Sequence, residues 1–103
     1  MKSSIPGVQE DFTAQLIEIL STESNVDEII LYGSRAKGNY KKGSDIDLTV
    51  KGEGLTLDWQ LAAETKLDDL LLPYKIDLSI YNHIDNNDLI NHIERIGKVI
   101  YKR

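Results

Sequence analysis

The sequence contains no cysteine, which excludes a disulfide framework and any metal site built on thiolates. It also lacks an excess of positive charge, since 12 Lys and Arg residues stand against 17 Asp and Glu residues and give a formal net charge of −5. This balance argues against non-specific binding to nucleic acid, which needs a basic face. No apolar run approaches the ~18 residues that would span a bilayer, and the N-terminus has no secretory pattern. We therefore expect a small soluble cytoplasmic protein with no membrane partner.

The composition is that of an ordinary globular protein, with 41% hydrophobic and 28% charged residues. A chain of 103 residues is long enough for one domain with a real core, and we expect residues 1–103 to form that single domain. It leaves little room for a separate domain that binds an acceptor. Residues 1–7 are expected to form a loose leader, because Pro6 and Gly7 interrupt regular structure.

Helical and strand periodicities alternate along the chain. Apolar residues at helical spacing predict helices at about 8–20, 56–71 and 86–96, with a single helical turn at 34–37. Alternating or β-branched runs predict strands at 28–32, 44–50 and 76–80, and a short edge strand at 99–101. This order predicts an α/β (α+β) fold with a mixed β-sheet of three to four strands flanked by helices.

The connections predict how these strands pair. About eleven residues separate the first two strands, and a parallel crossover normally needs a dozen or more, so we expect antiparallel pairing. The long helix before the third strand can serve as a crossover, which makes the second and third strands parallel. This topology predicts that Asp77, on the third strand, lies on the same side of the sheet as Asp45 and Asp47.

Asp45 and Asp47 are two residues apart on the second strand, so their side chains share one face with Cα atoms roughly 6.5 Å apart. Asp77 interrupts an apolar strand, where a carboxylate is costly unless it is paired or metal-bound. Three such carboxylates can hold two Mg²⁺ ions about 3.5–4 Å apart for in-line phosphoryl transfer. We expect Asp45 and Asp47 to bridge both ions, and Asp77 to bind the catalytic ion and accept the proton of an acceptor hydroxyl.

Gly33 and Ser34 follow the first strand, and ten residues separate Ser34 from Asp45. Glycine lets the backbone approach a phosphate closely, and the amide and hydroxyl groups of this turn can donate to anions. Several cations follow in an otherwise acidic chain, namely Arg35, Lys37, Lys41 and Lys42. A positive wall facing a carboxylate wall favours a site for a nucleoside triphosphate with its magnesium.

Each signal also has a simpler interpretation. The paired acids can be a solvated strand face, Asp77 can pair with Lys75, Gly33-Ser34 can be an ordinary turn, and Arg35 can pair with a nearby acid. The combination at this spacing favours the nucleotide–metal site. His83 and His92 are isolated in the sequence, and we expect His92 on the polar face of the last helix.

The combination of Gly33-Ser34, a ten-residue gap, Asp45-Ile46-Asp47 and a later strand acid, Asp77, resembles the DNA polymerase beta-like nucleotidyltransferase superfamily. In a chain this short, the segments 33–38 and 44–48 are similar to the minimal nucleotidyltransferase (MNT) branch. The resemblance implies a nucleotidyltransferase fold in which Gly33 and Ser34 hold the triphosphate, Arg35 contacts phosphate, and the three acids bind the metals.

The same resemblance implies a biological setting. MNT proteins are typically paired with an all-helical HEPN protein, often as antitoxin in a toxin–antitoxin system. It implies transfer of AMP from ATP to a tyrosine of such a partner, with two Mg²⁺ ions and a hetero-oligomer. Two other functions remain open: a non-catalytic nucleotide-binding subunit that masks a helical protein, and a nucleotidyltransferase for small molecules such as aminoglycoside-like hydroxyl compounds.

Overall fold

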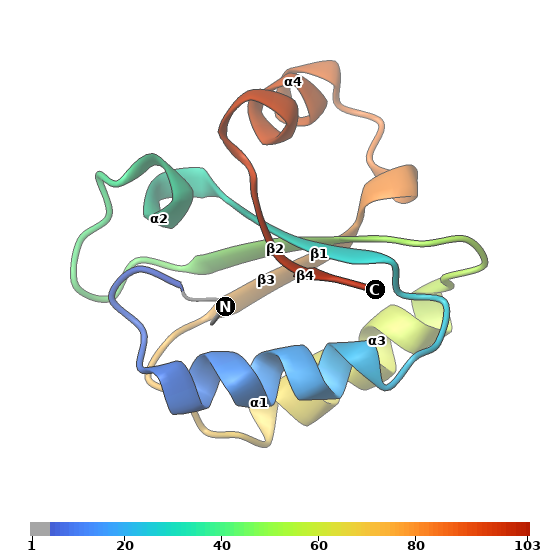
Figure 1. Cartoon of the computed structure of the whole chain (residues 1–103), viewed down its shortest axis with the longest axis horizontal. Helices are drawn as coiled ribbons and strands as arrows, with labels where there is room; N and C mark the ends of the chain where they lie inside the picture. The colour runs from blue at the N-terminus through green and yellow to red at the C-terminus, as the bar shows by residue number, and fades with distance from the viewer. Residues whose placement is uncertain (1–4) are drawn as a thin grey trace.

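The structure, a computed structural model, describes residues 5–103 as a four-stranded sheet with helices on both sides (Figure 1). The elements are, in order, α1 (Glu10–Ser21), β1 (Glu28–Tyr32), α2 (Gly33–Lys37), β2 (Ile46–Lys51), α3 (Leu57–Asp68), β3 (Ile76–Ile80), the 3₁₀ helix η1 (Tyr81–His83), α4 (Asn87–Ile96) and β4 (Lys98–Lys102). The predicted order of elements is confirmed. No helix within the described residues is long and apolar enough to cross a membrane.

The strands lie in the order β3-β2-β1-β4. β1 pairs antiparallel with β2 and with β4, whereas β2 and β3 are parallel and are connected through α3. The expected antiparallel and parallel pairings are therefore both confirmed. A mixed four-stranded sheet flanked by helices matches the predicted fold class.

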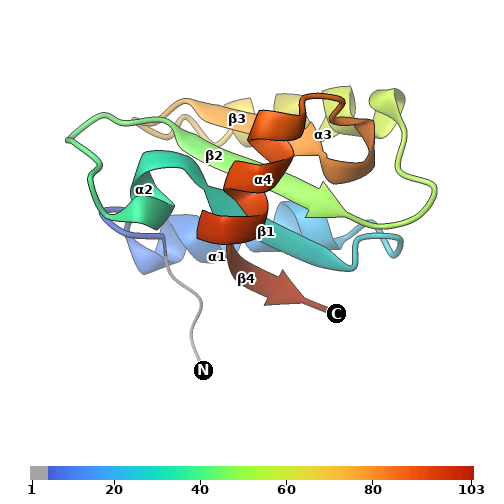
Figure 2. The same cartoon turned by 90° about the horizontal axis from the view of Figure 1, so that it is seen from above.

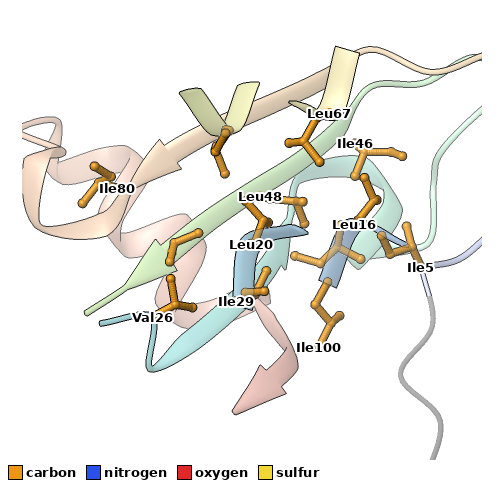
Figure 3. Packing of buried hydrophobic residues seen from close by; sticks show 14 of the residues in the cluster. Ile5, Leu16, Leu20, Val26, Ile29, Ile46, Leu48, Leu67, Ile80 and Ile100 are labelled. Atoms are coloured by element: carbon orange, nitrogen blue, oxygen red, sulfur yellow. The ribbon is translucent and has the colours of Figure 1, made fainter. Parts of the chain in front are cut away.

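Helices α1 and α3 cover one face of the sheet, and this side holds the main core (Figure 1). Every second residue of β2 enters it, because side chains alternate between the two faces of a strand. Ile46, Leu48 and Val50 are all 0% exposed. Figure 3 shows how apolar side chains of the helices meet those of the strands, among them Leu16, Leu20, Ile29, Leu67 and Ile80.

Helices α2 and α4 lie on the opposite face, where α4 crosses above the sheet (Figure 2). A second, smaller apolar cluster holds α4 down, in which Ile93 of the helix contacts Ile30 and Tyr32 of β1. A polar group adds to it: Lys51 Nζ lies 3.8 Å from a carboxylate oxygen of Glu94 and 4.4 Å from the ring centre of Tyr81. This cluster covers only part of the face, and the rest of it carries polar side chains such as Asp47 and Asp77.

The expectation of a loose leader is wrong for residues 5–7, and residues 1–4 lie outside the described part of the chain. Ile5 is 1% exposed and belongs to the main core. The Pro6 carbonyl accepts a hydrogen bond of 2.7 Å from Arg35, and the Gly7 carbonyl accepts one of 3.1 Å from the Tyr74 hydroxyl. Contacts made across the fold thus hold a segment whose own sequence favours no regular structure.

Candidate active site

Two of the predicted acids stand next to each other on neighbouring strands. Asp47 of β2 is in register with Asp77 of β3 in the parallel pair, and with Tyr32 of β1 in the antiparallel pair. Residues in register on adjacent strands point to the same face, and such strands are about 4.8 Å apart. The topology therefore places Asp47, Asp77 and Tyr32 together on the face that carries α2 and α4.

Asp45 lies just before β2, because the strand begins at Ile46 rather than at Ser44 as the alternation predicted. It is exposed, as is Asp77, whereas Asp47 between them is half-buried. The start of β2 is held by a hydrogen bond of 2.9 Å that the Ile46 amide donates to the Lys75 carbonyl. The three acids thus lie at the same end of the β2–β3 pair.

The electrostatics of Asp47 show that these carboxylates influence one another. Burial raises the pKa of Asp47 above its ordinary value, and the negative charges of Asp77 and Asp45 raise it further, while His92 lowers it. Tyr32 has a raised pKa too, chiefly because of burial, with a hydrogen bond to Ser79 acting in the opposite direction. A bound cation would relieve this repulsion, since it favours the ionised form of each acid.

Gly33 joins the end of β1 to α2 in a conformation that other residues rarely adopt, with φ of 75°. A Cβ atom added at this position would overlap the Oδ2 atom of Asp47. The missing side chain therefore allows the carboxylate of Asp47 to lie directly against the backbone of the turn. This close approach brings the predicted triphosphate-binding residues and the predicted metal-binding residues into one site.

His92 is a residue of this site that the sequence interpretation missed. The Gly33 amide donates a hydrogen bond of 3.1 Å to His92 Nε2, and the imidazole meets the Tyr32 ring edge to face at 6.1 Å. The prediction that His92 lies on the polar face of the helix is wrong. The spacing offered a signal, because His92 lies three residues after Leu89 and four before Ile96, within the stripe that faces the protein.

Arg35 has a different environment from the one expected of a phosphate ligand. Its side chain is 1% exposed, Nε and Nη2 donate to the Ser44 carbonyl at 3.1 and 2.8 Å, and Nη1 donates to the Pro6 carbonyl at 2.7 Å. The guanidinium carbon also lies 5.0 Å and 4.9 Å from the ring centres of Tyr40 and Tyr74. This arrangement does not support the expected phosphate contact, because carbonyl oxygens and aromatic rings already surround the guanidinium. Arg35 instead holds the N-terminal segment against the loop that leads into Asp45.

The donor chemistry of the site suits magnesium, which prefers carboxylate oxygens. Within residues 5–103, however, no three His, Asp or Glu side chains converge in a metal-binding arrangement. Asp47 and Asp77 share one face of the sheet, whereas Asp45 precedes the strand and its side chain is exposed. A cavity of about 690 Å³ lies elsewhere, between α1 and β4, and contains none of these acids.

The family model described as "Polymerase beta, Nucleotidyltransferase" matches residues 14–103. The chain belongs to this nucleotidyltransferase family. The match spans β1, the Gly33 turn and all three acids, so the candidate site lies inside the region that defines the family. No curated protein matches the sequence significantly.

Solved structures share the fold at low sequence identity. A chain of a toxin–antitoxin complex crystallised with AMP-PNP is 22% identical, with a TM-score of 0.72 over 93% of this chain and 75% of that one. A chain from the complex of a tri-AMPylated Shewanella oneidensis HEPN toxin with MNT antitoxin is 19% identical, with a TM-score of 0.70 over 93% of this chain and 74% of that one. A putative nucleotidyltransferase from Sulfolobus solfataricus is 16% identical, with a TM-score of 0.59 over 90% of this chain and 79% of that one. At these identities the likeness establishes the fold alone.

Proposed function

We propose that this nucleotidyltransferase transfers AMP from ATP to a tyrosine hydroxyl of an all-helical HEPN partner and thereby acts as its antitoxin. The observation that carries the proposal is the in-register alignment of Asp47 with Asp77 beside the Gly33 turn. The structural relatives support the choice of substrates, because one complex contains AMP-PNP and another an AMPylated HEPN toxin with its MNT antitoxin.

In this proposal Gly33 and Ser34 hold the triphosphate, Gly33 by letting the backbone approach it closely and Ser34 by donating hydrogen bonds. Asp45, Asp47 and Asp77 would hold two Mg²⁺ ions. The raised pKa of Asp47 supports a cation site, since its neighbours' charges disfavour its ionised form as long as no cation offsets them. When bound, the ions neutralise charge on the phosphates and on the departing pyrophosphate. Arg35 has no phosphate contact in this scheme and positions the loop before Asp45.

The reaction forms one bond and breaks one. The tyrosine oxygen of the partner attacks the α-phosphorus of ATP, and the bond from that phosphorus to the pyrophosphate oxygen breaks. Asp77 accepts the proton of the hydroxyl, a role for which its exposed carboxylate is accessible to an incoming side chain. The products are a tyrosine carrying AMP on its oxygen, and pyrophosphate.

The test is an AMP-transfer assay that uses the product of an adjacent gene as the candidate partner. The chain, the partner and Mg²⁺ are incubated with ATP labelled on the α-phosphate or, in parallel, on the γ-phosphate. We expect label on a partner tyrosine from the α-position only. The double variant Asp45→Asn, Asp47→Asn should abolish labelling, whereas Asp85→Asn, an exposed acid away from the site, should not.

The other functions give different results. Neutralisation of the partner by the double variant, without label, would refute the enzymatic proposal and establish masking by a binding subunit. Transfer of AMP to small hydroxyl compounds, with none to the partner, would show a small-molecule nucleotidyltransferase. Retention of partner labelling by the double variant would exclude the proposed metal-binding acids.

A further inference from the structure

His92 reaches the candidate site from a distant part of the chain. It belongs to α4, 59 residues after Gly33, and its Nε2 atom accepts the Gly33 amide proton at 3.1 Å. The ring is partly buried and packs edge to face on Tyr32, the residue just before Gly33. One imidazole thus contacts two consecutive residues at the point where β1 turns into α2.

We propose that His92 is a positioning residue that holds the Gly33-Ser34 turn in the orientation that receives the triphosphate. This inference rests on the proposed function, because it assigns a role in nucleotide binding. Gly33 has the most permissive backbone of any residue type, so its conformation with φ of 75° needs an outside contact to fix it. The hydrogen bond to His92 supplies such a contact and leaves the Ser34 amide and hydroxyl for the phosphates.

The partners fix the direction of this hydrogen bond, because the Gly33 amide can only donate and Nε2 of His92 is the acceptor. A side chain with an acceptor at the same reach can replace it, whereas a ring without an acceptor cannot. Comparing these two kinds of substitution therefore distinguishes the effect of the hydrogen bond from the effect of ring packing.

Helix α4 has contacts other than those of His92 that hold it in the fold. Ile93 packs on Ile30 and Tyr32, and Glu94 contacts Lys51 at the far end of β2. A substitution at position 92 that preserves the ring volume should therefore leave α4 seated. Any effect on nucleotide binding would then come from the turn.

The experiment compares three variants with the wild-type chain. His92→Phe keeps an aromatic ring but removes the acceptor, His92→Gln keeps an acceptor at similar reach, and His83→Phe changes the exposed second histidine as a control. The binding of Mg²⁺–ATP is measured by calorimetry, and KM and kcat by AMP transfer to the partner. The Gly33 amide proton is followed by NMR as a direct readout of the hydrogen bond.

We expect His92→Phe to weaken Mg²⁺–ATP binding about fivefold, the effect of losing one hydrogen bond of ordinary strength. KM for ATP should rise by a similar factor while kcat changes little, and the Gly33 amide resonance should move upfield. His92→Gln should recover most of the affinity, and His83→Phe should match the wild type. If His92→Phe does not fold, His92→Asn, whose side chain is too short to reach Gly33, should show the same loss.

Wild-type or tighter affinity in a folded His92→Phe variant would overturn the inference, since the turn would then not need the histidine. Equal losses in the Phe and Gln variants would also overturn it, because the acceptor would not matter. If the wild-type chain itself binds no Mg²⁺–ATP, the proposed function fails together with the inference. A wild-type chain that binds ATP, with no difference at position 92, refutes the inference alone.

Discussion

The two faces of the sheet are built from the same strands but differ in polarity and in the size of their apolar clusters. On the side of α1 and α3, alternate residues of β2 are completely buried and purely apolar. On the side of α2 and α4, the intervening residues are polar, and Asp47 has neighbours that oppose its ionisation. A period of two along each strand therefore separates the residues that stabilise the fold from those that form the candidate site.

This division explains how a chain of 103 residues tolerates three neighbouring carboxylates. The buried face provides the apolar contacts that hold the strands, so the site face can keep side chains that repel one another. The comparison predicts that substitutions on the two faces will affect different measurements. The predictions that follow begin with the largest expected effect.

Leu48→Ala should have the largest effect on stability. Leu48 is fully buried in β2, next to Asp47 in the chain but on the opposite face. The cavity left by the substitution should lower the free energy of unfolding by about 3 kcal/mol, measured by urea denaturation. A comparable loss in Asp47→Asn would contradict the proposed difference between the faces.

Arg35→Met should lower the free energy of unfolding by about 2 kcal/mol, because it removes a charged donor from two partly buried carbonyl groups while it keeps an unbranched aliphatic stem. Lys37→Met, an exposed change on the same short helix, is the matched control and should cost less than about 0.5 kcal/mol. Both are measured by denaturation. A stable Arg35→Met variant that no longer binds Mg²⁺–ATP would instead make Arg35 a phosphate ligand.

Gly33→Ala and Gly38→Ala should cost similar stability but differ in activity. Both glycines have a positive φ, 75° and 94°, so an alanine should cost about 1 kcal/mol at either position. A Cβ atom at position 33 would displace the Asp47 carboxylate, whereas a Cβ atom at position 38 would meet nothing within 4 Å. We expect AMP transfer to fall at least about a hundredfold in Gly33→Ala alone.

Full AMP transfer by Gly33→Ala would show that the close approach of Asp47 to the turn has no functional role. An equal loss in Gly38→Ala would assign the effect to backbone strain in this segment, and not to Asp47.

Asp47→Asn should have the smallest effect on stability, and of opposite sign. The folded protein raises the pKa of Asp47 above its ordinary value of 3.8, so the ionised carboxylate disfavours folding once the pH rises through that range. Asparagine removes this penalty and should raise Tm slightly at neutral pH, with the difference vanishing below about pH 3.8. Calorimetric Tm values across this pH range provide the measurement, with Asp85→Asn as control.

A lower Tm for Asp47→Asn at neutral pH would mean that the ionised carboxylate is stabilised by the fold. The carboxylates of Asp45 and Asp77 would then not destabilise ionised Asp47, and no cation would be needed to offset their repulsion.

The sequence predicted much of this arrangement because the relevant signals are local. The alternation in residues 46–50 assigns each side chain of β2 to a face, and the short link from β1 makes that pair antiparallel. The crossover through α3 then aligns Asp77 with Asp47. These steps need only periodicity and the lengths of connections.

What the sequence did not predict depends on contacts between distant residues. Nothing near Arg35 indicates that the Pro6 carbonyl, 29 residues earlier, and the ring of Tyr74 will enclose it. His92 likewise meets Gly33 only because α4 folds back over β1. Such contacts follow from packing in three dimensions, to which a single sequence gives no direct access.

The most direct test of the proposed site is to locate its metal ions. Crystals of the chain grown with Mn²⁺ and a non-hydrolysable ATP analogue would be examined by anomalous scattering, because manganese replaces magnesium at oxygen ligands. We predict two manganese peaks bounded by the carboxylates of Asp45, Asp47 and Asp77, with the triphosphate on the Gly33-Ser34 turn. Manganese bound to the nucleotide without contact to these carboxylates would contradict the account.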